Sequence, residues 1–190
     1  MKAKFNITIA TLFAALGLLV FYGPVRYFRQ PEALPAVDAQ VLAANTAVPV
    51  QADVQGRPVR IVVPKANVDV KVIDGYYFPE KKDWTLTEDN AQFAVMTALA
   101  NNKEGNTFIY GHNHDQVFKR LTELKLGDQA TVYTDNGRKF TYTLRTIHDT
   151  VPSDNSLFKY EGAPILTLQT CSGSFSQNRQ LFTFDFKEVI

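Results

Sequence analysis

Beyond about residue 57, short apolar runs alternate with turn-forming residues, a pattern that predicts mostly β structure. Residues 139–150 alternate between apolar and polar side chains, as expected of a strand with one buried face. The turn Asp135-Asn136-Gly137 joins this run to a second strand-like run at 130–133, and such a turn between two runs is typical of a β-hairpin. Residues 106–110 are predicted to be a buried strand.

Only short helices are expected. The clearest candidate begins near Gln116, because Val117, Leu121 and Leu124 follow at helical spacing on one face. Asp115 precedes this stretch and is expected to cap the helix.

The amino-terminal region differs from the rest because residues 5–23 carry no charge and are mainly apolar. At about 1.5 Å per residue, a helix of this length approaches the roughly 30 Å hydrocarbon core of a bilayer. We therefore expect a cytoplasmic tip at 1–4, a transmembrane signal anchor at 5–23, a linker at 24–57 and a folded domain at 58–190. We expect a single-pass protein of the cell membrane whose folded domain is extracellular. Basic residues flank the run on both sides, so the positive-inside rule favours this orientation only mildly. Cleavage in the linker, after a small residue, is the alternative.

Composition narrows the function classes. The chain has 190 residues, a formal net charge of +1 and 45% hydrophobic residues, which suits one well-packed domain. Without a basic stretch that carries interleaved aromatic residues, a nucleic-acid partner is not expected. A single cysteine excludes an internal disulfide and any multi-cysteine metal site, and we expect no metal and no cofactor.

That single cysteine, Cys171, ends the strand-like run 165–170, and Arg179 opens the next run after a turn containing Ser, Gly and Asn. A hairpin through this turn would pair Cys171 with Arg179 on one face of the sheet, with their Cβ atoms roughly 5 Å apart. A guanidinium at this distance favours a thiolate or a developing oxyanion. A buried apolar cysteine beside a solvated arginine is the alternative.

A nucleophilic cysteine needs a base, and three histidines are available. His112 and His114 lie in the loop that leaves the buried strand 106–110, where catalytic groups are often placed. They are two residues apart and so share a face of an extended chain. We favour His112, which follows a glycine. His148 lies inside the alternating strand and is expected to face solvent or to pack.

These motifs together resemble the sortases, cysteine transpeptidases of bacterial surfaces. The resemblance rests on Thr167-Leu168-Gln169-Thr170-Cys171 followed by Arg179, on Gly111-His112 after a strand, and on the stretch from Val117-Phe118 to Gly127-Asp128. It covers about residues 58–190 and implies a closed eight-stranded β-barrel whose first strand includes Arg60–Val63. The turn after Cys171 lacks the proline that many members carry.

The resemblance implies Cys171 as nucleophile, His112 as general acid/base and Arg179 as oxyanion stabiliser. It further implies cleavage of a carboxy-terminal Leu-Pro-x-Thr-Gly-like sorting signal through a thioacyl enzyme, and transfer to an amino group of a cell-wall precursor or a pilin lysine. Two other classes stay open: a cysteine peptidase that uses water as acceptor, and a membrane-tethered β-barrel binding module without chemistry.

Side chains that line a groove are less readable from sequence. Thr170 is a strand former that is also placed to line the cleft beside the cysteine. Trp84, Tyr76 and Tyr77 are candidates for lining it, although large aromatic residues in a barrel usually serve core or rim packing.

Overall fold

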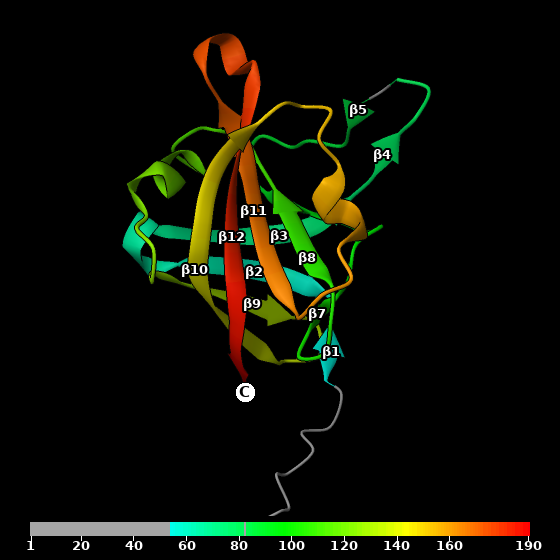
Figure 1. Ribbon diagram of the computed structural model, residues 1–190, viewed down its shortest axis with the longest axis vertical. Helices are drawn as coiled ribbons and strands as arrows, with labels where there is room; N and C mark the ends of the chain where they lie inside the picture. Colours follow the sequence, from blue (N-terminus) through cyan, green and yellow to red (C-terminus); the bar gives the residue numbers. More distant parts are fainter. Residues whose placement is uncertain (1–53, 82) are drawn as a thin grey trace, which may run out of the picture. The chain divides into compact units, whose positions relative to one another are not determined.

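The computed structural model describes residues 54–81 and 83–190, and eight strands in this part of the chain form a closed barrel (Figure 1). The order around the barrel is β10-β12-β11-β8-β6-β3-β2-β9, and all neighbouring pairs are antiparallel except β11–β8 and β3–β6. The predicted all-β class and closed eight-stranded barrel are therefore confirmed. The strands are β2 (Pro58–Val63), β3 (Val68–Gly75), β6 (Ala91–Ala94), β8 (Asn106–Tyr110), β9 (Gln129–Thr134), β10 (Lys139–Thr150), β11 (Ile165–Ser172) and β12 (Asn178–Val189).

Shorter elements decorate the barrel. Two small antiparallel pairs join β1 (Gln55–Gly56) to β7 (Ala100–Asn101), and β4 (Tyr77–Phe78) to β5 (Asp83–Trp84). Strand β1 lies inside the stretch predicted as linker. The helices of the described residues are all single 3₁₀ turns: η1 (Pro64–Ala66), η2 (Lys119–Glu123), η3 (Ser156–Lys159) and η4 (Ser174–Ser176).

The membrane prediction concerns a different part of the chain. Within residues 54–81 and 83–190, no helix has the length and apolar character needed to cross a bilayer. The predicted anchor at 5–23 lies outside the described residues.

The core fills the barrel with side chains from alternate strand positions. In β9 and β10 each apolar residue on one face is buried and its neighbours are half-buried or exposed, which is the alternation seen in the sequence. Removing this apolar surface from water stabilises the barrel by roughly 25 cal/mol per Å². The largest fully buried side chains include Ile61, Phe93, Phe118, Phe140, Tyr142, Phe182 and Phe184.

The helix predicted near Gln116 is wrong in type and start. The structure has the 3₁₀ turn η2 instead, and no side chain caps it. Asp115 forms an ion pair with Lys119 (3.1 Å) rather than capping the turn. An α-helix capped at Asp115 would begin with a bond from the Lys119 N–H to the Asp115 carbonyl, but this N–H donates to the carbonyl of His114 in the histidine loop instead (3.2 Å). The apolar spacing was a true signal of burial, because Val117, Leu121 and Leu124 are all buried.

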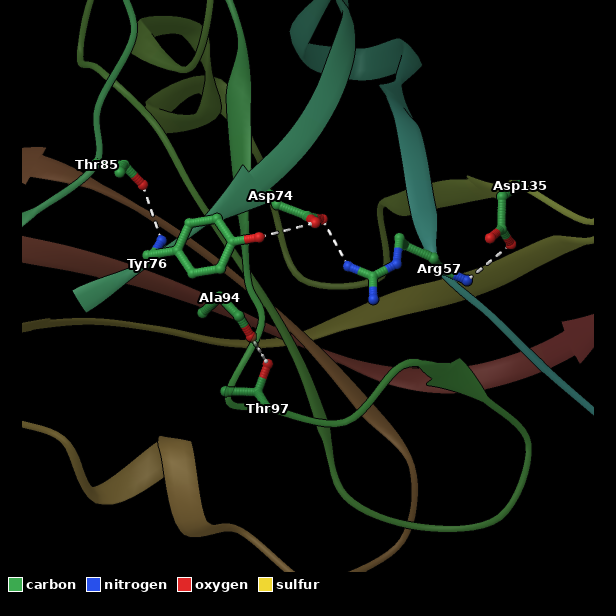
Figure 2. A network of polar contacts seen from close by, with 7 residues as sticks. All are labelled: Arg57, Asp74, Tyr76, Thr85, Ala94, Thr97 and Asp135. Atoms are coloured by element: carbon green, nitrogen blue, oxygen red, sulfur yellow. Dashed lines mark hydrogen bonds and ion pairs between the residues drawn. The ribbon is translucent and has the colours of Figure 1, made fainter.

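A polar network fixes the root of the β4–β5 hairpin (Figure 2). Asp74, near the end of β3, accepts hydrogen bonds from the Arg57 guanidinium (2.7 Å) and the Tyr76 hydroxyl (3.3 Å). The N–H of Tyr76 donates to Thr85 Oγ1 (2.8 Å) across the hairpin. The Tyr110 hydroxyl, at the end of β8, donates to the Thr85 carbonyl (2.9 Å). The hairpin is thereby tied to the barrel strand that leads to the histidine loop.

Candidate active site

The pairing predicted for Cys171 and Arg179 is present. The two residues are direct partners in the antiparallel ladder between β11 and β12. Cys171 is a half-buried free thiol, and direct partners in such a ladder have Cβ atoms within roughly 5 Å. The turn that follows projects from one end of the barrel, opposite the carboxy terminus (Figure 1).

The histidine loop adjoins this pair because β8 runs parallel to β11. The ladder ends with Gln169 opposite Tyr110. His112 follows two residues after this last pair, in the loop that leaves β8. The Asn113 side-chain amide donates to the Cys171 carbonyl (2.9 Å), which holds the loop against the end of β11.

Gly111 makes the close approach possible. Its N–H donates to the Gln169 carbonyl (3.1 Å), and its carbonyl accepts a hydrogen bond from Thr170 Oγ1 (3.1 Å). A Cβ at this position would lie 2.6 Å from Val117 Cγ1, so a larger residue would push the loop away. Thr170 is buried, its hydroxyl bonds to the loop backbone, and the residue is among those that line the cavity beside Cys171; its part in substrate binding stays a prediction.

The second histidine of the loop stacks on the first. The His112 and His114 ring centroids are 5.4 Å apart with an interplanar angle of 24°. His114 Nδ1 accepts a hydrogen bond from the N–H of Gln116 (3.3 Å), and its Nε2 lies 4.0 Å from a Glu88 carboxylate oxygen. Both imidazoles therefore lie together in the loop that Asn113 holds against the end of β11. His148 is exposed on β10, as expected.

Arg179 is held by the turn beside it. Its Nη1 donates to the carbonyls of Ser176 and Asn178, both at 3.0 Å. A guanidinium has five N–H donors, so these bonds orient the group and leave other donors for a ligand. Within the turn Phe175 and Ser176 adopt positive φ values of 58° and 59°, which non-glycine residues rarely do.

A cavity of about 90 Å³ opens beside the cysteine. Gly111 lines it, whereas His112 does not. Burial raises the pKa of Tyr110, another lining residue, to about 12, so this hydroxyl stays protonated at neutral pH. The lining residues are Asp83, Trp84, Leu86, Phe108, Tyr110, Gly111, Phe158, Gln169, Thr170, Cys171 and Arg179.

The sortase domain family matches residues 61–183. The chain belongs to the sortase family. Members of this family are cysteine transpeptidases, as the sequence motifs had implied.

Individual relatives agree with this assignment. Sortase SrtE1 of Streptomyces coelicolor is 28% identical over 134 residues; the match covers 64% of this chain but only 38% of that protein. The crystal structure of Sortase E1 from the same organism, with a tripeptide in its active site, aligns with a TM-score of 0.55 and 26% identity over 71% of this chain and 90% of that one. Sortase A of Corynebacterium diphtheriae shares the fold at 19% identity, with a TM-score of 0.59 over 71% of this chain and 62% of that one.

Some residues that shape this sortase's cleft were not predicted. Phe158 lies in η3, within the long loop between β10 and β11, and packs against Trp84 with ring centroids 5.2 Å apart. Leu86 and Phe108 complete the apolar wall. The apolar pair Leu157-Phe158 in a turn-rich loop was the signal available for Phe158. Trp84 was correctly expected at the groove, whereas Tyr76 does not line this cavity and instead bonds to Asp74.

Proposed function

We propose that this protein is a membrane-anchored cysteine transpeptidase that cleaves a Leu-Pro-x-Thr-Gly-like sorting signal and transfers the protein to an amino group. The observation that carries the proposal is that Cys171 is paired with Arg179 and that the loop carrying His112 is bound to the Cys171 carbonyl through Asn113. Family membership supports the reaction class. The tripeptide bound in the active site of Sortase E1 supports a peptide as the ligand.

Acylation would begin with attack of the Cys171 sulfur, as thiolate, on the scissile carbonyl carbon. The carbonyl π electrons move to oxygen, and the oxyanion is stabilised by Arg179 and backbone N–H groups. When the C–N bond breaks, His112 as imidazolium gives its proton to the leaving amine. The product is a thioester between Cys171 and the sorted protein.

Deacylation would reverse these roles. An incoming primary amine attacks the thioester carbonyl, and neutral His112 takes the proton that the nitrogen loses as the new amide forms. The Cys171 sulfur leaves as thiolate, which restores the starting ion pair with the protonated imidazole. An amino group of a cell-wall precursor or of a pilin lysine is the acceptor that the family suggests.

The uncharged run at 5–23 supports an extracellular catalytic domain on a single-pass membrane protein. This location would place the thiol where surface proteins emerge.

Mass spectrometry of the full chain in detergent, incubated with sorting-type peptides with and without an added amine, tests the proposal. We expect an amine-dependent ligated product that is absent from Cys171→Ala. The matched pair His112→Gln and His114→Gln assigns the base: the first should abolish turnover and the second should retain it. No turnover across a broad peptide library would overturn the proposal.

A cysteine peptidase is the second candidate, because the same three residues can pass the acyl group to water. Cleavage without ligation at saturating amine would favour it. A binding module without chemistry would instead show an unreactive Cys171 thiol that is unaffected by removal of Arg179.

A further inference from the structure

A second cavity, of about 240 Å³, lies next to the one at Cys171. Trp84 and Phe158 line both cavities, so these two rings separate them. The second cavity is formed by the β4–β5 hairpin, Met96 just beyond β6, and the loop between β10 and β11. Its lining residues are Tyr77, Trp84, Met96, Pro152, Ser153, Asp154, Asn155 and Phe158.

Three aromatic rings form part of this lining and are inclined to one another. Trp84 lies 5.1 Å from Tyr77 at 49° and 5.2 Å from Phe158 at 56°, measured between ring centroids. Rings at such angles do not cover each other's faces as stacked rings would. Tyr77 is 40% exposed and Met96 58% exposed, so the cavity is open to a ligand. Inclined ring faces attract a cation, and the Met96 thioether suits an aliphatic stem.

The one formally charged residue of the lining is Asp154. Its carboxylate accepts hydrogen bonds from the Thr150 hydroxyl (2.6 Å) and from the N–H of Ser156 (3.0 Å). Mainly these bonds, with a small contribution from His148, lower the pKa of Asp154 to about 2, so it is ionised at any physiological pH. None of the eight lining residues is a lysine or an arginine. The cavity thus combines aromatic faces with an anion and supplies no cation of its own.

Lys81 of the adjacent hairpin contacts a ring outside this lining. Lys81 lies over the ring of Phe78, with its Nζ 5.6 Å from the centroid. Phe78 is not among the lining residues.

We propose that this second cavity binds the side chain of a lysine or arginine in the polypeptide that the enzyme cleaves, at a position flanking the residues bound at Cys171. The inference rests on the proposed function for the identity of the polypeptide, and on the cavity alone for the preference for a cation.

The bound cation would belong to the donor polypeptide and not to the acceptor. An ammonium group beside the ionised Asp154 stays protonated and therefore has no lone pair with which to attack a thioester. The Trp84 and Phe158 rings also stand between this cavity and the one that Cys171 lines. The cavity is suited to recognition and not to the transfer step.

The single tryptophan of the chain allows a test that needs no turnover. Trp84 is the only tryptophan and lines both cavities, so in the full chain carrying Cys171→Ala its fluorescence responds to a ligand in either one. Titration with Nα-acetyl-lysine methylamide should shift the emission and saturate, and should weaken as salt is added. The uncharged norleucine analogue should bind about tenfold more weakly. Equal responses to the two amides, or none at the solubility limit of either, would overturn the proposal.

Variants locate the effect. Tyr77→Leu removes one exposed ring, and Asp154→Asn removes the charge while keeping an oxygen acceptor; each should reduce the lysine preference severalfold. Glu161→Gln changes an exposed carboxylate of the same loop that does not line the cavity, and should leave the preference unchanged. If Asp154→Asn unfolds the loop, Tyr77→Leu still decides the question.

Kinetics with the wild-type full chain then connect the cavity to its substrate. In donor peptides, lysine is moved through the positions flanking the sorting motif and compared with norleucine at each position. We expect about a tenfold higher kcat/KM for lysine at one position, lost in Tyr77→Leu. A lysine preference confined to acceptor peptides would assign the cavity to the other substrate and contradict the proposal. If no donor turns over, the proposed function fails, while the fluorescence titration still judges the cation site.

Discussion

Two hairpins of the barrel, β9–β10 and β11–β12, solve the same geometric problem in opposite ways. The turn of β9–β10 places a glycine, Gly137, at the positive φ of 80°. The Asn136 side-chain oxygen accepts a hydrogen bond from Thr134 Oγ1 (2.7 Å). The turn of β11–β12 also contains a glycine at positive φ, but it forces Phe175 and Ser176 into the same region.

Both turns are exposed, and side-chain bonding separates them further. The Asn136 side chain donates to the Gln55 carbonyl (2.8 Å), whereas the apolar ring of Phe175 is fully exposed. Local sequence and local geometry agree in the first turn and conflict in the second. Such conflicts persist where a site requires them, and the second turn is the one that holds Arg179. The comparison indicates that β9–β10 serves the fold and β11–β12 serves the chemistry.

The sharpest way to test this division is Arg179→Lys. Lysine keeps the charge but loses the planar guanidinium. That group can bind the two turn carbonyls and at the same time offer further N–H donors to an oxyanion. We expect kcat/KM to fall about 10²-fold, as for loss of one oxyanion donor, with little change in Tm. Arg145→Lys, in an exposed ion pair with Asp185 on the same sheet, is the matched control and should change neither. If Arg179→Lys lowers Tm without lowering kcat/KM, the β11–β12 hairpin serves the fold and not the chemistry.

Gly137→Ala probes the structural hairpin. No atom lies within 4 Å of the Cβ that alanine would add, so the cost is the backbone conformation alone. We expect the free energy of unfolding to fall by about 1–2 kcal/mol with kcat/KM unchanged. Denaturant melts and peptide assays on the same preparation measure both, and a large activity loss would show that this turn also serves the site.

Phe175→Asn probes the conflict in the functional turn. Asparagine tolerates the left-handed region better than phenylalanine, so we expect a gain of about 0.5 kcal/mol in the free energy of unfolding. Phe78→Asn is the control: it makes the same substitution at another exposed phenylalanine, in β4, whose φ is not positive. It should give no gain in the free energy of unfolding. If Phe175 contacts substrate, kcat/KM will fall as stability rises. A lower free energy of unfolding in Phe175→Asn than in wild type would contradict the inference that the backbone is strained at Phe175.

The loop between β10 and β11 offers the smallest effect, through pH. Hydrogen bonds from Thr150 and Ser156 lower the folded-state pKa of Asp154 to about 2, below its unfolded value near 3.9. Its contribution to stability is therefore fully present above about pH 4 and is lost as the pH falls towards 2. Asp154→Ala should be less stable than wild type at pH 7, and the difference should shrink between pH 4 and 2. A difference that is constant with pH would rule out this titration as its source.

The sequence predicted what depends on local pattern. Strand alternation and turn composition predicted β10, the β9–β10 hairpin and the pairing of Cys171 with Arg179, because register in a hairpin follows from the turn. The position of His112 in a loop at the end of a barrel strand was predictable because the residue follows a buried apolar run. The roles of these residues in the reaction stay predictions.

What the sequence missed depends on contacts between distant segments. Trp84 and Phe158 come from different loops and meet only because β5 and η3 converge beside β8. The spacing of apolar residues along the chain does not predict a contact between two such distant segments. The helix near Gln116 was wrong for a related reason: the Lys119 N–H, which would make the first helical bond, bonds to His114 of the histidine loop, a competing partner that helical spacing does not reveal.

The parallel pairing of β8 with β11 has a consequence for the order of folding. Leu166 lies opposite Thr107, so the chain must close a loop of about 60 residues before the two strands can pair. Closing such a loop costs entropy before any contact offsets it, so non-local pairings form slowly. Arg179, on the last strand, joins later still along the chain. During synthesis Cys171 would thus remain an ordinary thiol, without its charged neighbours, until nearly the whole domain has emerged and closed.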